Sequence, residues 1–178
     1  MLYNNDMKKL LAATFAALLM VGCGEEETLF ERSKRLAESG HAPAQFNLGL
    51  MYALGQGGLA EDKTEAVKWY RKAARQGEVK AQFNLALMYA FGEGGLAEDK
   101  TEAVRWFRKA ADQGEVKAQY KLGVAYANGI GVSKDKTEAV RWFRKAADQG
   151  DALARSYLTA QALGVPKGGT TIEANTTK

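Results

Sequence analysis

The sequence has few of the residues on which most enzyme and metal sites depend. Among its 178 residues there is one cysteine, Cys23, and one histidine, His41. A single cysteine forms no intramolecular disulfide, and one residue of each kind cannot build a Cys/His metal cage. A Ser-His-Asp or Cys-His catalytic arrangement is not expected either. We therefore expect a protein that is not an enzyme and has no metal and no cofactor.

Proline and net charge are also low. The two prolines are compatible with a mostly helical chain, because proline breaks helix interiors. The formal charge of +4 is too small to indicate nucleic acid as a partner. Apolar residues make up 46% of the chain and charged residues 26%, which is an ordinary balance for a soluble protein. The composition favours a helical protein that does not bind nucleic acid.

The N-terminal segment has the order of an export signal. In residues 7–22 (MKKLLAATFAALLMVG), two lysines precede an apolar run, and small residues lead into Cys23. This order is typical of a secretory signal. The run is shorter than the roughly 20 apolar residues of a membrane-spanning helix. We therefore predict a signal peptide over residues 1–22 and a polar tether over residues 23–28.

The end of this segment, Leu19–Cys23 (LMVGC), resembles the lipobox of bacterial lipoproteins. In that family the signal is cut before the cysteine, which then carries the lipid. The resemblance implies lipidation of Cys23 and a location in the periplasm or cell envelope, bound to a membrane. An aspartate after the cysteine resembles an inner-membrane retention signal, so Gly24 favours the outer membrane.

The rest of the chain is dominated by an internal repeat. Three similar copies occupy residues 41–77, 78–114 and 115–150, and the last copy lacks one loop residue. Such periodic self-similarity is the signature of a repeat architecture. Within the first copy, Ala44, Leu48, Met51 and Tyr52 follow an i, i+4, i+7, i+8 pattern. Each copy therefore predicts two helices, the first over Ala44–Leu54 in copy one.

The second helix of each copy has clear boundary signals. It begins at Asp62, and Glu65 three positions later predicts a capping box. Asp99 with Glu102 and Asp135 with Glu138 repeat the arrangement. A glycine closes each second helix, where a left-handed C-cap favours that residue, at Gly77, Gly114 and Gly150.

Partial copies flank the repeats. Residues 29–40 align with a second helix and predict a core face made of Leu29, Phe30, Leu36 and Ala37. Residues 151–164 align with a first helix. The ends of solenoids are expected to be atypical because one side has no neighbour. Residues 165–178 have the composition of a disordered tail.

The repeat positions resemble the Sel-one-like repeat family, which is related to tetratricopeptide repeats. In the first copy the pattern falls on Ala44, Leu48, Gly49, Tyr52, Gly55, Gly57, Asp62, Ala66, Trp69, Ala73, Ala74 and Gly77. The resemblance covers residues 29–164 and implies an all-α, right-handed α-α superhelix with protein–protein adaptor roles. Some secreted relatives have a disulfide in every repeat and act on β-lactams. No repeat here contains a cysteine, so that activity is not implied.

Two surfaces of the expected solenoid could bind a partner. One is an apolar stripe on the outer side of the first helices, made of Phe46, Leu50, Leu54, Phe83, Leu87, Phe91, Tyr120 and Val124. The resemblance places this side on a concave wall, but curvature could equally bury the stripe between repeats. The second helices present rows of Lys and Arg, which we expect to be a solvated convex face. The tryptophans and tyrosines recur at one-repeat spacing and are expected in the core.

These observations predict a lipid-anchored envelope scaffold that binds a protein or peptide through the stripe of the first helices. A periplasmic immunity protein that neutralises a toxin is an alternative. A hydrolase of β-lactams or peptidoglycan, related to the cysteine-rich repeat proteins, is a third and less favoured possibility.

Overall fold

The computed structural model describes residues 28–163, which form eight α-helices and no strand. The predictions for the signal peptide, for Cys23 and for the tail over residues 165–178 lie outside the described residues. The helices are α2 (Leu29–Glu38), α3 (Ala42–Leu54), α4 (Lys63–Arg75), α5 (Val79–Phe91), α6 (Lys100–Asp112), α7 (Val116–Asn128), α8 (Lys136–Asp148) and α9 (Ala152–Ala162).

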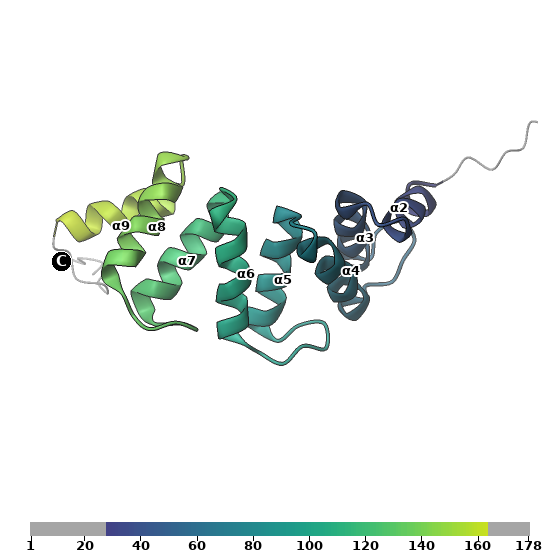
Figure 1. The fold of residues 1–178 in the computed structure, drawn as a ribbon, viewed down its shortest axis with the longest axis horizontal. Coiled ribbons are helices and arrows are strands. Elements are labelled where there is room, and N and C mark those ends of the chain that lie inside the picture. The colour runs from purple at the N-terminus through teal and green to yellow at the C-terminus, as the bar shows by residue number, and fades with distance from the viewer. Residues whose placement is uncertain (1–27, 164–178) are drawn as a thin grey trace, which may run out of the picture.

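The helices stack in one elongated row, with α2 and α9 at opposite ends (Figure 1). Each helix packs against the next one in the chain. We call α3, α5, α7 and α9 the A helices and α2, α4, α6 and α8 the B helices. Each repeat is thus an A–B pair, and the expected all-α solenoid is confirmed.

The helix boundaries follow from local capping. The Asp62 carboxylate accepts a hydrogen bond from the Glu65 backbone N–H at 2.9 Å, as predicted for a B-helix N-cap. The second half of the expected capping box does not form. The Glu65 side chain instead pairs with Lys68 at 2.7 Å, and the Asp62 N–H donates to the Tyr52 carbonyl at 2.8 Å. The loop before each B helix is therefore attached to its own A helix, which takes over the role predicted for the glutamate.

The core consists of small residues on every helix and large rings on the B helices. Leu48, Leu85 and Leu122 are fully buried at one-repeat spacing on the A helices. A β-carbon added to Gly49 would lie 2.8 Å from the Tyr70 ring, so the missing side chain lets α3 approach α4 closely. This close approach sets the distance between the A helix and the B helix of the repeat.

The two ends differ from the repeats. Leu29, predicted to lie in the core, is 80% exposed. Its position corresponds to Ala66, which faces the A helix of its own repeat, whereas within residues 28–163 no A helix precedes α2. At the other end, Ser156 and Thr159 stand on α9 where the repeats have an aromatic residue and a glycine or alanine. A polar face at the end of a solenoid keeps it from stacking on further copies.

Candidate functional site

The predicted apolar stripe divides into a packed part and an exposed part. Its first residue in each repeat is partly buried and lies against a B-helix ring of the same repeat. The ring centroids are 5.9 Å apart for Phe46 and Tyr70, and 5.6 Å apart for Phe83 and Phe107. Tyr120 and Phe143 form the third such pair. These residues therefore contribute to packing within each repeat.

The last residues of the stripe are open to solvent. Leu54 is 57% exposed and Phe91 is 66% exposed, while Leu50, Leu87 and Val124 are partly buried. The exposed positions occur where each A helix ends, beside the loop that leads to its B helix. The stripe is thus neither a continuous open groove nor a buried seam, because its exposure increases toward the C-terminal end of each A helix.

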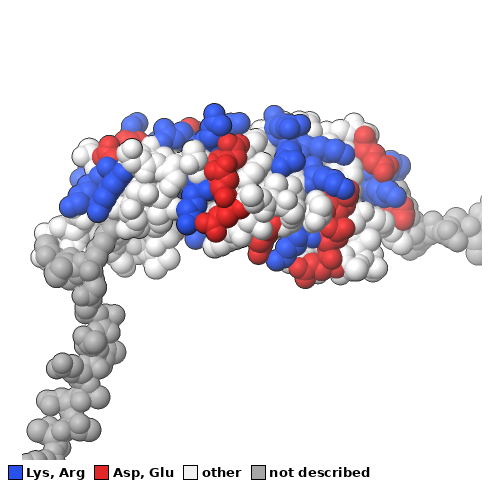
Figure 2. Space-filling model, turned by 90° about the horizontal axis from the view of Figure 1, so that it is seen from below, with Lys and Arg blue, Asp and Glu red and all other residues white. Residues whose placement is uncertain are grey.

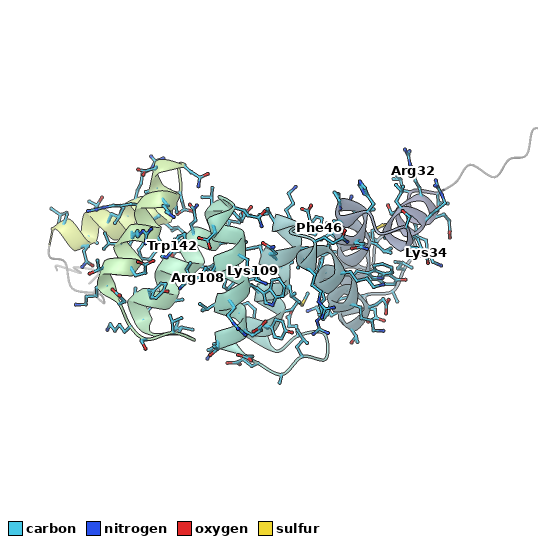
Figure 3. The ribbon with its side chains drawn as sticks, in the orientation of Figure 1. Arg32, Lys34, Phe46, Arg108, Lys109 and Trp142 are labelled. Carbon is cyan, nitrogen blue, oxygen red and sulfur yellow. The ribbon has the colours of Figure 1, made fainter. Side chains whose placement is uncertain are left out.

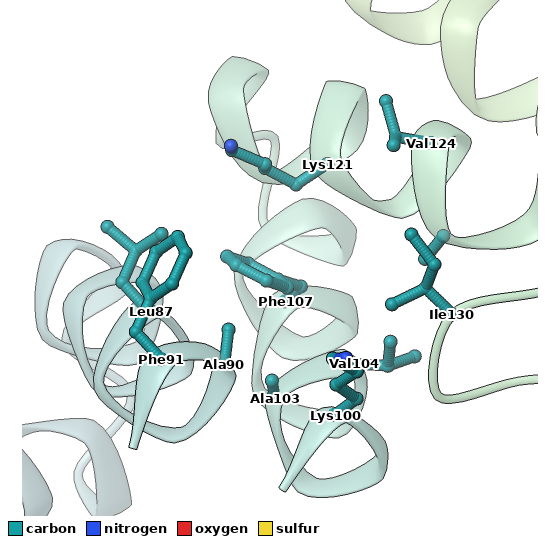
Figure 4. A pocket seen from close by; sticks show the side chains of 11 residues that line it. Leu87, Ala90, Phe91, Lys100, Ala103, Val104, Phe107, Lys121, Val124 and Ile130 are labelled. Carbon is teal, nitrogen blue, oxygen red and sulfur yellow. The ribbon is translucent and has the colours of Figure 1, made fainter. Parts of the chain in front are cut away.

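An apolar pocket of about 250 Å³ lies within this exposed part. The second junction is the place where α6 lies between α5 and α7. The first junction is the equivalent place one repeat earlier, where α4 lies between α3 and α5. In Figure 4, Leu87 and Phe91 face Val124 and Ile130 across the pocket. Phe107 lies between them, and Lys121 stands at the rim. The second junction therefore offers a recess lined by carbon atoms, with an ammonium group beside it.

The first junction has the same outline but a different filling. Met88, at the position of Ala125, is only 8% exposed. Glu93, at the position of Ile130, forms an ion pair with Lys63 at 3.1 Å across the equivalent opening. At the second junction, the corresponding Lys100 pairs with Glu98, next to its own helix, at 2.9 Å.

A polar pair adds to this difference. Tyr70 forms a side-chain hydrogen bond with Asn84 at the first junction. Burial raises the pKa of the Tyr70 phenol above its usual value, and the hydrogen bond with Asn84 offsets part of the rise. Phe107 and Lys121 occupy the equivalent positions at the second junction. The hydroxyl is therefore replaced by a bare ring, and the amide by a charged side chain.

The charges of the two faces also differ. The A helices α3, α5 and α7 contain no acidic residue, and their charged residues are Lys80, Lys117 and Lys121. The B helices carry rows of Lys and Arg that gather along one long edge of the molecule (Figure 2). Some are neutralised by a glutamate three residues earlier, as with Lys68 and Glu65. This hydrogen bond and the glutamate charge raise the pKa of Lys68.

Buried glutamines form a network that sequence reasoning missed. Gln82 lies on α5 and is 4% exposed. Its side-chain amide donates to the Ala74 carbonyl at the end of the preceding B helix at 3.2 Å. Its amide oxygen accepts from Gln113, at the end of α6, at 2.8 Å. Gln45 with Gln76 and Gln119 with Gln149 repeat the arrangement. The one-repeat spacing of these glutamines was the signal that could have revealed them.

The repeated tryptophans are buried, as expected, whereas the repeat tyrosines Tyr52, Tyr89 and Tyr126 are only partly buried and pack against the core. Trp69, Trp106 and Trp142 are buried, and a lysine three residues later lies over each indole ring. The Lys109 ammonium is 4.0 Å from the centroid of the Trp106 ring. Figure 3 shows Lys109 on α6 and Trp142 on α8. The Tyr89 hydroxyl accepts a hydrogen bond from Arg71 of the preceding repeat at 3.1 Å. The tryptophan rings are therefore engaged in packing, and the Arg71–Tyr89 hydrogen bond joins two neighbouring repeats.

Neither a metal-binding cluster nor a membrane-spanning helix is found within residues 28–163. No group of three or more His, Cys, Asp or Glu side chains in this range could hold a metal ion. Within the same range, no helix has the length and apolar content needed to cross a bilayer.

The sequence pattern of the Sel1 repeat matches residues 42–78, 79–115 and 116–151. No curated protein sequence matches the chain. Such repeats typically mediate protein–protein interactions, and scaffolds built from them are generally non-catalytic.

Solved structures resemble the chain over most of its length. A Sel1 repeat protein from Oxalobacter formigenes is 42% identical, with a TM-score of 0.67, over 72% of this chain and 95% of that one. The c5321 protein, a protective antigen of uropathogenic Escherichia coli with an SLR fold, is 43% identical, with a TM-score of 0.69. That match covers 75% of this chain but 29% of the antigen. The cysteine-rich protein B of Helicobacter pylori shares the fold, with a TM-score of 0.57 at 22% identity. That match covers 73% of this chain and 97% of the Helicobacter protein.

Proposed function

Because the chain belongs to the Sel1 repeat family, we propose that it is a non-catalytic scaffold whose A-helix surface binds a protein or peptide. We also propose that a lipid on Cys23 anchors it in the bacterial cell envelope, at the outer membrane. Both proposals concern features of the chain that the family alone does not specify.

The exposed part of the apolar stripe is the observation that carries the binding proposal. Leu54 and Phe91 expose more than half of their surface on neighbouring A helices, and an apolar pocket adjoins Phe91. Water does not favour such a surface, and exposed apolar patches commonly mark interaction sites. The basic face has weaker support as a binding site, because its charges are partly paired with local glutamates.

The location rests on the sequence before Cys23. The change Cys23→Ser should abolish labelling by radioactive palmitate and leave an uncleaved precursor, since the lipid is attached to the thiol. Equal labelling of the variant and the parent protein would show that Cys23 is not the site of lipidation.

The binding proposal is tested by crosslinking in isolated membranes, followed by mass spectrometry. Phe91→Ser should reduce the amount of partner that is recovered. If Phe91 is a hot spot worth about 2 kcal/mol, the affinity for the partner should fall about thirtyfold. Leu29→Ser is the matched control, because Leu29 is 80% exposed but lies on α2, away from the A-helix surface. Equal recovery with both variants would exclude the A-helix surface. Turnover of nitrocefin or of muropeptides by the purified protein would contradict a non-catalytic role.

A further inference from the structure

We propose that the pocket at the second junction binds one bulky apolar side chain of an acidic peptide segment, and that the first junction does not. This inference rests on the proposed function of the A-helix surface and deepens it. It names which junction receives the anchoring side chain and what chemistry flanks that side chain.

The size of the pocket favours one side chain of a peptide over a complete small molecule. Its volume of about 250 Å³ is below the roughly 300–1,000 Å³ that drug-sized ligands usually occupy. The floor and walls come from three successive helices and one loop, with Phe107 and Val104 on α6, Leu87 on α5 and Ile130 after α7. Such a recess suits a Phe, Leu or Met side chain, which gains by leaving water.

The charge around the pocket favours acidic flanks. Lys121 lies at the rim and is exposed, and within the described residues it forms no ion pair with a carboxylate. Lys117 lies one helical turn earlier on the same helix and is also exposed. α5 and α7 contain no Asp or Glu that could compete for a cationic partner. Carboxylates on either side of an apolar anchor would therefore meet the ammonium groups of α7, while the nearby Glu98 is already paired with Lys100.

The first junction lacks the open recess and the lysine at its rim. At the position of Ala125 it has the larger Met88, which is 8% exposed and belongs to the same core cluster as Val67 and Tyr70 of α4. At the position of Ile130 it has Glu93, which pairs with Lys63. Asn84, which takes the place of Lys121, forms a hydrogen bond with Tyr70 and carries no charge. The chain thus contains two versions of one site, one closed and one open, within the same solenoid.

The second repeat also differs behind the pocket. Gly49 and Gly123 leave space for the Tyr70 and Phe143 rings, which a β-carbon would approach to 2.8 Å. Ala86 has that β-carbon, and its ring partner Phe107 is 6% exposed, whereas Tyr70 and Phe143 are each 1% exposed. The repeat that has the methyl group of Ala86 is thus also the one whose ring, Phe107, is slightly more exposed, and this ring lines the pocket.

The test uses the full chain purified without lipid, carrying Cys23→Ser, and end-blocked pentapeptides with two glutamates on each side of a central residue. Phe and Leu at the centre should shift the backbone amide signals of Ala90, Ala103 and Ala125 in ¹⁵N NMR titrations. The peptide with a central Ala should bind about tenfold more weakly or worse, because little apolar surface is buried. Replacing the glutamates by lysines should weaken binding of the Phe peptide, and added salt should reduce the difference.

The first junction supplies the matched variants. Ala125→Met introduces the residue that the chain already accommodates at position 88, and it should lower affinity for the Phe peptide at least tenfold. Ile130→Glu and Lys121→Asn, which copy Glu93 and Asn84, should each weaken binding severalfold. Thermal unfolding by circular dichroism checks that all three variants remain folded. A loss of fold in Ala125→Met would leave Ile130→Glu and Lys121→Asn to decide.

The outcomes separate this inference from the proposed function. Equal binding to the parent and to Ala125→Met, or shifts centred on Leu54 of α3, would overturn the pocket assignment while supporting the A-helix surface. An absence of shifts at millimolar Phe peptide would also overturn it. The proposed binding role of the A-helix surface fails if Phe91→Ser leaves recovery of the membrane partner unchanged.

Discussion

The first and second junctions share their buried frame and differ at their surface. In both, a buried leucine of an A helix, a B-helix tryptophan and a glutamine pair hold one repeat against the next. Above this frame, the first junction has Met88 and an ion pair, whereas the second has Ala125 and an open pocket. The positions that define the repeat thus maintain the solenoid, and the positions between them decide which junction can accept a ligand.

The largest effect should be the same at both junctions. Trp69→Ala on α4 and Trp106→Ala on α6 should each lower the free energy of unfolding by about 3–5 kcal/mol, because both remove a large buried ring. Chemical denaturation followed by circular dichroism measures this quantity. A loss below about 1 kcal/mol for only one of the two variants would show that the two frames are not equivalent.

Exchanging the fillings should separate the junctions. Met88→Ala should cost about 2–5 kcal/mol, since it creates a cavity at the first junction. Ala125→Met should change stability by about 1 kcal/mol or less, because the added side chain enters space that is already open. The same denaturation experiment compares both variants with the parent. Equal destabilisation by the two changes would mean that the second junction has no spare volume.

The glutamine network should have an intermediate effect. Gln82→Ala and Gln119→Ala should each cost about 1–3 kcal/mol, because the change removes a buried hydrogen-bonding partner at either junction. Lys80→Ala provides a control on the exposed side of the same helix and should stay within about 0.5 kcal/mol. Hydrogen exchange at the ends of α4 and α6 would show whether the loss is local to the junction.

The smallest effect concerns pH and the first junction only. The pKa of Tyr70 is raised in the folded state, so the neutral phenol stabilises the fold. That stability is fully present below the ordinary tyrosine pKa near 10 and is lost as the pH rises through the raised folded value. Tyr70→Phe, which copies Phe107, should remove this part of the alkaline loss. Between pH 8 and 11 the melting temperature should therefore fall more steeply for the parent than for Tyr70→Phe. Equal slopes for the two proteins would show that burial of the phenol is not the cause.

The sequence was sufficient to predict the repeat architecture. The one-repeat spacing of Trp69 and Leu48, the aspartate caps and the closing glycines identified both helices of every repeat. The same approach misplaced Leu29, because the core pattern assumes a neighbouring A helix, and residues 28–163 contain none before α2. It also assigned Glu65 to a capping box, although the Tyr52 carbonyl takes the N–H that this glutamate was expected to hold.

The candidate site was harder to predict, because its shape depends on which residues meet between repeats. A helical pattern placed Phe46 and Phe91 on one stripe, but packing against Tyr70 covers the first, and the end of α5 exposes the second. The pocket depends on Ala125 and Ile130, which look unremarkable within their own repeat. Their effect is visible only against Met88 and Glu93 in the preceding copy.

The glutamine network has a consequence for how such a chain can change over generations. Each buried glutamine bonds the end of the helix before it and the glutamine that closes its own repeat. Removing residues 78–114 as a unit would bring Gln119 to the Ala74 carbonyl that Gln82 now holds. Recombination between copies can therefore alter the number of repeats without stranding a buried amide. The same event would place α7 directly after α4, and the recess around Phe107 would be lost in a single step.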